Sequence, residues 1–126
     1  MHIKIDGRSI GPKFRPYVIA EMSANHNGNI RSAFEIIDEA KGAGADAVKI
    51  QTYTPDTMTL DCEDEDFQIH GGLWDGWSLY KLYEWAQTPL EWHEQLFTYA
   101  KESGITIFSS AFDRTAVDLL ERLDTP

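Results

Sequence analysis

Three segments of strand type alternate with three segments of helix type along the 126 residues of the chain. Residues 17–21, 46–51 and 105–110 have the branched, apolar content of short buried strands. Each is followed, directly or after a loop, by apolar residues at helical spacing. Repeated alternation of this kind predicts a parallel sheet with right-handed crossovers, either doubly wound or closed as a barrel.

Capping residues mark where the helices are expected to begin. Asn29 and Asp113 are suitable N-caps for the first and third helices. Before the second, Thr88, Pro89 and Glu91 have the spacing of a capping box with proline at the first helical position. These signals predict helices that start directly after residues 29, 88 and 113.

The first residues of the chain form a separate element in this interpretation. Residues 3–10 alternate around Asp6-Gly7, a turn pair that favours a hairpin. Three strand–helix units follow, whereas a closed barrel of this type has eight. We therefore expect residues 1–126 to be the N-terminal part of a TIM (β/α)8 barrel, with the remaining strands outside this chain.

Composition excludes several classes of function. No apolar run approaches the roughly 20 residues of a membrane span, and the start of the chain lacks the apolar segment of a secretory signal. Eleven basic against 21 acidic residues give a net charge of -10, which would repel a nucleic acid. Cys62 is the only cysteine, so no disulfide framework is expected and a cytoplasmic location is predicted.

Residues 52–87 form a connection far longer than the roughly 2 to 6 residues that usually join such units. It contains an acidic run at 61–66, which is either a site for a hard cation or a solvated loop. The run lacks the glycine and spacing of a calcium loop, which favours the solvated loop. A short aromatic helix near residues 78–87 is either a lid over a sugar or an ordinary packing element.

Polar side chains occur at the carboxyl ends of all three predicted strands. Lys49 and Gln51 alternate with apolar residues, so they face away from the helices. Glu21 ends the first strand and Ser110 the third. In a parallel barrel these ends surround one pocket, which predicts a shared site. The alternative is that Lys49 reaches water and Glu21 is only its surface partner.

Two histidines have open interpretations. His26 is either a metal ligand, an acid–base group or a turn residue, and the lack of a second ligand at suitable spacing favours the turn residue. His93 lies inside the second predicted helix beside Trp92 and is expected to be structural.

Four motifs resemble the N-terminal half-barrel of the sialic acid synthase family: "IAEMSANHNG", "GADAVKIQTYTPDT", "GGLWDGWSLYKLYEWAQTP" and "FSSAFD". The second and third look most like the pseudaminic acid branch of that family. The resemblance implies a (β/α)8 barrel followed by a small antifreeze-like domain, both extending beyond Pro126, in a homodimer. One departure is Ala111, where the family commonly has proline.

The resemblance also implies an activity, the condensation of phosphoenolpyruvate with an acetamido-hexose aldehyde. The products are a nine-carbon 2-keto sugar acid of the pseudaminic acid type and phosphate. A divalent metal, Mn or Mg, is expected to activate the aldehyde through ligands beyond Pro126. Two alternatives stay open, namely an N-acetylneuraminate synthase acting on N-acetylmannosamine and an inactive fragment that binds a sugar or anion. No nucleic acid or membrane partner is expected.

The same resemblance assigns site residues. Lys49 and Ser110 would hold the carboxylate of phosphoenolpyruvate, and Glu21 and Gln51 would face the sugar and its aldehyde, with Glu21 transferring a proton. Catalytic roles therefore fall on Glu21, Lys49 and Gln51, and no metal ligand is assigned within residues 1–126. The expected substrate-binding residues are Asn25, His26, Tyr53, Ser110 and Phe112.

Overall fold

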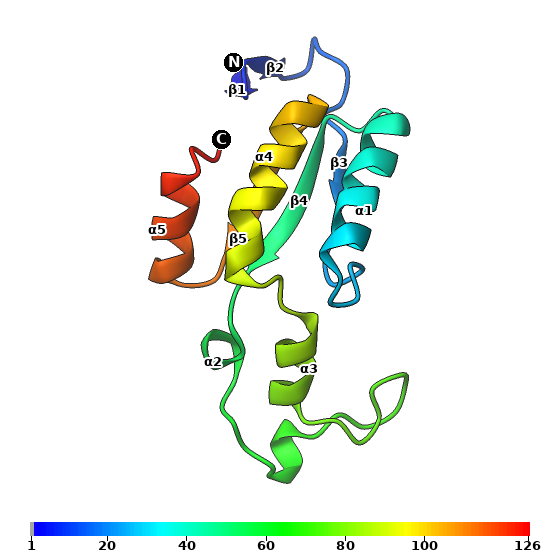
Figure 1. The fold of residues 1–126 in the computed structure, drawn as a ribbon, viewed down its shortest axis with the longest axis vertical. Helices are drawn as coiled ribbons and strands as arrows, with labels where there is room; N and C mark the ends of the chain where they lie inside the picture. The colour runs from blue at the N-terminus through cyan, green and yellow to red at the C-terminus, as the bar shows by residue number, and fades with distance from the viewer. Residues whose placement is uncertain (1) are drawn as a thin grey trace.

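The computed structural model describes residues 2–126, which form two sheets and a set of surrounding helices (Figure 1). The strands are β1 (Ile3–Ile5), β2 (Arg8–Ile10), β3 (Ile19–Glu21), β4 (Ala47–Thr52) and β5 (Thr106–Ala111). The helices are α1 (Ile30–Gly42), α2 (Pro55–Met58), α3 (Leu79–Ala86), α4 (His93–Ser103) and α5 (Arg114–Arg122), with short 3-10 helices η1 (Glu65–Phe67) and η2 (Leu90–Trp92). No helix within residues 2–126 is long and apolar enough to cross a membrane.

The predicted strand–helix alternation is confirmed. β3, β4 and β5 form a parallel sheet in that order. Val48 and Ile50 are fully buried and belong to the hydrophobic core together with residues of α1 and α4, so these two helices cover one face of the sheet. The residues between them, Lys49 and Gln51, are only partly buried and face the other way. The core consists of Met22, Ala33, Ile37, Ala40, Val48, Ile50, Leu96, Ala100, Ile105 and Ile107.

Two of the three predicted helix starts are confirmed. The side chain of Asn29 accepts a hydrogen bond from the N–H of Arg31 at 2.9 Å, and that of Asp113 accepts one from the N–H of Ala116 at 2.6 Å. Such N-caps satisfy backbone donors that have no partner inside the helix.

The predicted capping box at residue 88 is wrong. Thr88 is buried and makes no cap, and α4 begins only at His93, after the short η2 turn. The hydroxyl of Thr88 lies instead 3.4 Å from Nε2 of His26. A contact with a residue 62 positions earlier in the sequence has therefore replaced the local cap.

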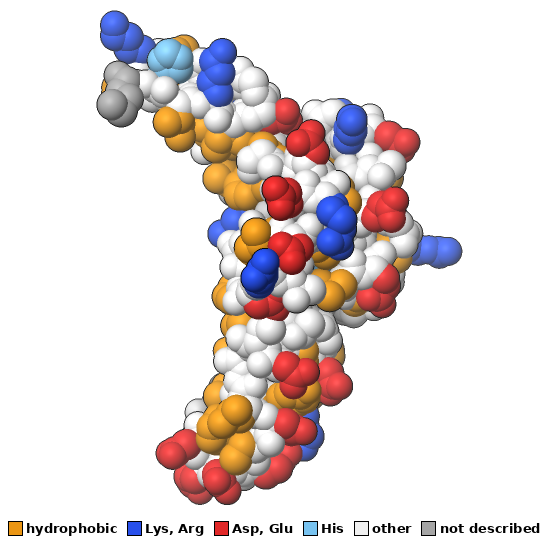
Figure 2. All heavy atoms as spheres, turned by 90° about the vertical axis from the view of Figure 1, so that its left-hand side faces the viewer, with side chains coloured by type: hydrophobic (Ala, Val, Ile, Leu, Met, Phe, Trp, Pro, Cys, Tyr) orange, Lys and Arg blue, Asp and Glu red, His pale blue; other side chains and the backbone are white. Residues whose placement is uncertain are grey.

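Residues 53–92, here called the arm, project from the carboxyl ends of β4 and β5 (Figure 1). Within the arm, the hydroxyl of Tyr80 donates to Asp56 at 3.0 Å, and Lys81 forms an ion pair with Glu63 at 3.0 Å. Acidic residues 61 and 63–66 are exposed, which is the arrangement of a solvated loop. Figure 2 shows the arm as a narrow projection whose end carries acidic side chains around a hydrophobic patch.

The predicted N-terminal hairpin is confirmed, with Asp6 and Gly7 at its turn and both in the left-handed region (φ 47° and 77°). It lies at the amino ends of β4 and β5, opposite the arm (Figure 1). The hydroxyl of Thr106, the first residue of β5, donates to the carboxylate of Asp6 at 2.8 Å. The hairpin therefore covers the end of the sheet that is remote from its polar strand ends.

Asp46 fastens this hairpin to the sheet. Its carboxylate pairs with Arg8 of β2 and with Arg15, and it accepts the backbone N–H of Val18 at 2.8 Å. The Arg8 guanidinium and the Val18 N–H hold the pKa of Asp46 well below its usual range, with Arg15 adding to the effect. The carboxylate thus joins β2 and residues 15–18 to the start of β4.

Asp46→Asn should loosen this junction, because the amide loses the charge that holds both arginines while it keeps an oxygen for Val18. We expect a lower Tm for the full-length protein and faster amide exchange across residues 3–10. Differential scanning fluorimetry and hydrogen exchange measure the two effects. Asp118→Asn, on the exposed surface of α5, is the matched control. Equal Tm values for the two variants would contradict the assignment.

Candidate functional site

An ion pair lies at the carboxyl end of the parallel sheet. Nζ of Lys49 is 3.0 Å from Oε2 of Glu21, and the two residues are direct partners in the β3–β4 register. Their side chains are 35% and 37% exposed, so water still reaches both. The carboxylate opposite Lys49 is thus that of Glu21, the partner named in the alternative interpretation of this lysine.

Gln51 and Ser110 lie next to this pair. They are direct partners in the β4–β5 register, and strand alternation places both on the face that carries Lys49. Both are partly buried. Four polar side chains from three strands therefore lie at one end of the sheet, and their roles stay predictions.

The loop between β3 and α1 is held in an unusual backbone conformation. Ser23 and Asn27 have φ values of 48° and 50°, a region that residues other than glycine rarely occupy. The N–H and hydroxyl of Ser23 donate to Oε1 of Glu21 at 3.2 Å and 3.3 Å. Asn25 donates its amide to the carbonyl of Met22 at 2.9 Å. The loop thus orients Glu21 while its other carboxylate oxygen pairs with Lys49.

His26 lies in the same loop, but its side chain is fully buried. The N–H of Gly28 donates to Nδ1 at 3.1 Å, so Nε2 carries the proton of the neutral ring and faces Thr88. Trp92 packs edge-on against the ring, with centroids 5.4 Å apart. His26 thus joins the β3–α1 loop to residues 88–92, the last residues of the arm. Within residues 2–126 no group of three or more His, Cys, Asp or Glu side chains is arranged to hold a metal ion.

Aromatic residues flank the polar strand ends. Tyr53, directly after β4, is nearly buried and packs edge-on against Phe112 and against Tyr83 of α3, with ring centroids 5.5 Å and 5.9 Å apart. Burial raises the pKa of Tyr53, which keeps its hydroxyl protonated. Phe112 is 42% exposed. The two predicted aromatic site residues are therefore in contact, and they join the arm to the sheet.

A buried hydrogen-bond network lies behind the polar face. Oγ1 of Thr52 is 2.7 Å from Nε2 of His93 and 2.6 Å from Oγ of Ser109, and Nδ1 of His93 is 3.1 Å from the carbonyl oxygen of Pro89. His93 is fully buried, as is Thr52. The sequence predicted a structural His93 but not this network, because its members come from β4, β5 and α4.

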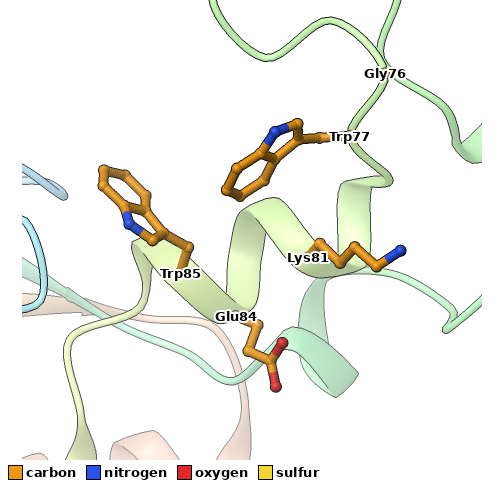
Figure 3. Close-up of a pocket in the computed structure, with 5 residues that line it drawn as sticks. All are labelled: Gly76, Trp77, Lys81, Glu84 and Trp85. Atoms are coloured by element: carbon orange, nitrogen blue, oxygen red, sulfur yellow. The ribbon is translucent and has the colours of Figure 1, made fainter.

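A surface hollow of about 530 Å³ lies on the arm, lined by Gly76, Trp77, Lys81, Glu84 and Trp85. Figure 3 shows the two indole rings on one side of α3. Each tryptophan is 37% exposed, and both pack against Trp74 with centroids 5.1 Å and 4.8 Å away. These tryptophans form a surface cluster rather than part of the main core.

We expect the stability of the folded protein to depend on pH because two histidines are buried. Burial lowers the pKa of both His26 and His93 below the ordinary 6.5, so the folded protein keeps them neutral where the unfolded chain takes up protons. The free energy of unfolding should therefore be highest above pH 6.5 and should fall as the pH is lowered below that value. Each histidine contributes at most about 1.4 kcal/mol per pH unit.

Urea unfolding of the full-length protein between pH 7.5 and 5.5 measures this slope. His70, whose ring is exposed on the arm, supplies the control variant His70→Gln, which should keep the same slope. A free energy of unfolding that stays constant across this range would contradict the buried, neutral assignment.

Comparison with known proteins gives consistent matches. The NeuB family profile matches residues 36–126. The pseudaminic acid synthase of Campylobacter jejuni is 56% identical over 108 residues, which is 86% of this chain and 32% of that protein. The pseudaminic acid synthase of Helicobacter pylori is 50% identical over 111 residues, or 88% of this chain and 33% of that protein. The chain thus spans about a third of the length of the curated relatives it matches.

A solved structure matches the fold. The N-acetylneuraminic acid synthetase of Leptospira borgpetersenii, crystallised with citrate, superposes with a TM-score of 0.80 at 23% identity, covering 99% of this chain and 39% of that one. That protein is a TIM-barrel enzyme, so the predicted fold class is confirmed, and the three strand–helix units correspond to part of such a barrel. The resemblance seen in the four sequence motifs is confirmed as well, and the chain belongs to the NeuB family.

Proposed function

We propose that the full-length protein condenses phosphoenolpyruvate with an acetamido-hexose aldehyde, giving a nine-carbon 2-keto sugar acid and phosphate. The observation that carries this proposal is the Lys49–Glu21 pair beside Gln51 and Ser110, at the end of the sheet where TIM barrels have their active sites. An ammonium group, a carboxylate and two neutral polar groups suit a reaction between an anion and an aldehyde. The identities to two pseudaminic acid synthases support the same activity.

In this proposal Lys49 and the hydroxyl of Ser110 hold the carboxylate of phosphoenolpyruvate. Lys49 would then share its charge between that carboxylate and Glu21, a contact of charge-assisted strength. A bond forms between C3 of phosphoenolpyruvate and the aldehyde carbon, and the aldehyde oxygen takes up a proton. Water adds at C2, and breaking the bond from C2 to the phosphate oxygen releases phosphate and leaves the 2-keto group.

Glu21 is the proposed proton-transfer group at the aldehyde oxygen, and Gln51 is proposed to orient the sugar. Proton transfer suits Glu21 because Ser23 fixes one of its oxygens while the carboxylate stays partly exposed. Tyr53 and Phe112 are proposed to form the apolar wall of the sugar site. Asn25 and His26 were expected to bind substrate, but His26 is fully buried and the Asn25 amide donates to the Met22 carbonyl. They are therefore proposed to hold the β3–α1 loop in place beside the substrate.

A divalent metal, Mn or Mg, belongs to this proposal but not to the residues described. Glu21 is the only carboxylate of the strand-end group, its partner is a cation, and residues 2–126 contain no cluster of metal-ligating side chains. The residues present do not make a metal site. We propose that its ligands lie in the part of the full-length protein that this chain does not span, where the metal would polarise the aldehyde.

The organisation of the full-length protein is also a proposal. Residues 1–126 would open a barrel domain that is completed by later strands and followed by an antifreeze-like domain, in a cytoplasmic homodimer. The length of the curated relatives, about three times the matched region, supports further chain after these units.

The proposed substrate is a trideoxy diacetamido hexose rather than N-acetylmannosamine. Exposed Phe112 and nearly buried Tyr53 give apolar surface beside the strand ends, which suits a 6-deoxy carbon better than a 6-hydroxyl group. In a competition assay with both sugars and phosphoenolpyruvate, we expect at least about 10-fold selectivity for the deoxy sugar. Mass spectrometry of the two nine-carbon products measures it.

A preference for N-acetylmannosamine in that assay would assign the protein to N-acetylneuraminate synthesis. Binding of phosphoenolpyruvate without phosphate release from any aldehyde sugar would instead indicate a non-enzymatic binding module. Phosphate release by the full-length, metal-supplemented protein is therefore the primary test of the proposed function.

A further inference from the structure

We propose that His93 is a positioning residue for the site, acting through Thr52 and Ser109 to fix the carboxyl ends of β4 and β5. The proposal rests on the proposed function, because the strand ends in question carry Gln51 and Ser110. His93 itself has no exposed surface and touches no substrate in this scheme. Its effect is transmitted by the hydroxyl of Thr52, which lies between the two strands and α4.

The direction of the hydrogen bonds follows from their partners. The carbonyl of Pro89 can only accept, so Nδ1 of His93 carries the proton and Nε2 accepts from the hydroxyl of Thr52. Ser109 then donates, either to Thr52 at 2.6 Å or to the carbonyl of Ile50 at 3.1 Å. Burial lowers the pKa of His93, which keeps this neutral form at neutral pH. Every member of the network thus has a partner.

Strand geometry connects the buried network to the polar face. Thr52 and Ser109 point toward the helices, so their neighbours Gln51 and Ser110 point to the opposite, polar face. Beyond the paired residues of β4 and β5, the N–H of Phe112 donates to the carbonyl of Thr52 at 3.3 Å. Fixing the Thr52 side chain therefore fixes the backbone from which the proposed substrate contacts extend.

The two hydrogen bonds of His93 can be separated by substitution. Asparagine can place an amide N–H near the position of Nδ1 and so keep the bond to Pro89, but it cannot reach Thr52. Glutamine can place an amide oxygen near the position of Nε2 and so accept from Thr52, but it loses the bond to Pro89. A purely structural His93 would be sensitive to both changes through stability alone.

The experiment compares His93→Asn, His93→Gln and Thr52→Val in the full-length protein, each assayed for phosphate release and for Tm. For His93→Asn and Thr52→Val we expect kcat to fall about 10- to 100-fold, because displaced groups no longer meet the reacting atoms. The KM for phosphoenolpyruvate should rise by no more than about 10-fold, because the Ser110 hydroxyl is displaced while the Lys49 charge is kept. His93→Gln should retain kcat within about 3-fold.

Nonadditivity provides the second criterion. The His93→Asn and Thr52→Val double variant should lose no more activity than either single variant, because both remove the same interaction. If the loss of kcat in the double variant equalled the product of the two single losses, the proposal would be overturned. A folded His93→Asn protein whose kcat stays within about 2-fold of the wild type would overturn it as well. His70→Asn, a change on the exposed arm, should leave kcat and Tm unaltered.

Hydrogen exchange separates failure of this proposal from failure of the proposed function. If the wild type releases no phosphate, the proposed function is wrong, and the positioning role is judged by exchange alone. The amide of Phe112 should exchange at least about 10-fold faster in His93→Asn and Thr52→Val than in His93→Gln. Equal exchange in all three variants would overturn the positioning role whatever the activity.

Discussion

Lys49→Met in the full-length protein should lower kcat/KM for phosphoenolpyruvate by at least about 100-fold while the protein stays folded. A charge-assisted contact with the substrate carboxylate contributes roughly 1.5 to 3 kcal/mol, and its loss alone accounts for about 10- to 150-fold. Removing the ammonium group also leaves the carboxylate of Glu21 without its partner, next to an anionic substrate. The KM for phosphoenolpyruvate should therefore rise. Steady-state kinetics at varied phosphoenolpyruvate measure both effects.

The arm supplies a matched control for this substitution. Lys81 forms an ion pair with Glu63 at the same 3.0 Å separation, but both side chains lie on the exposed surface of the arm. Lys81→Met should change kcat/KM by less than about 2-fold, as expected for a surface pair. Equal losses in the two variants would mean that charge removal acts through the fold, and full activity in folded Lys49→Met would remove Lys49 from the site.

Glu21→Gln should reduce kcat by about 100- to 10,000-fold, the range expected when a proton-transfer group is lost. The amide keeps the shape of the side chain and an oxygen for the Ser23 N–H, so the loop is expected to hold. The KM for phosphoenolpyruvate should stay the same or fall, because Lys49 no longer shares its charge with a carboxylate. Lys49→Met is thus expected to raise the KM for phosphoenolpyruvate, whereas Glu21→Gln is not.

Glu63→Gln serves as the control, since it removes a carboxylate from the equivalent pair on the arm. If Glu21→Gln raised KM and left kcat unchanged, Glu21 would be a binding group and proton transfer would have to be assigned to another residue. Pre-steady-state measurement of phosphate release distinguishes a slowed chemical step from slowed product release.

Local patterns predicted most of the elements of this fold. The alternation of apolar segments, the Asp6-Gly7 turn and the caps at Asn29 and Asp113 depend on residues close together in the sequence, and all are found in the structure. The side chains of Lys49 and Gln51 were predicted to face away from the helices because alternation along one strand decides it.

Contacts between distant segments explain what local patterns missed. Thr88 has the local signature of a helix cap, but it is buried against His26, and α4 begins later as a result. The burial of His26 depends on Trp92, and the network of His93 depends on a strand 41 residues earlier. Such contacts exist only once the strands are in register, so no window of neighbouring residues contains them.

The position of the N-terminal hairpin has a practical consequence for handling the protein. Asp46 and Thr106 hold the hairpin at the amino ends of the strands, whereas the ion pair of Glu21 and Lys49 lies at the carboxyl ends. An affinity tag or fluorescent reporter fused ahead of the hairpin would therefore extend from the end of the sheet opposite the proposed site (Figure 1). Immobilising the protein through such a tag would leave the carboxyl ends of the strands open to solution.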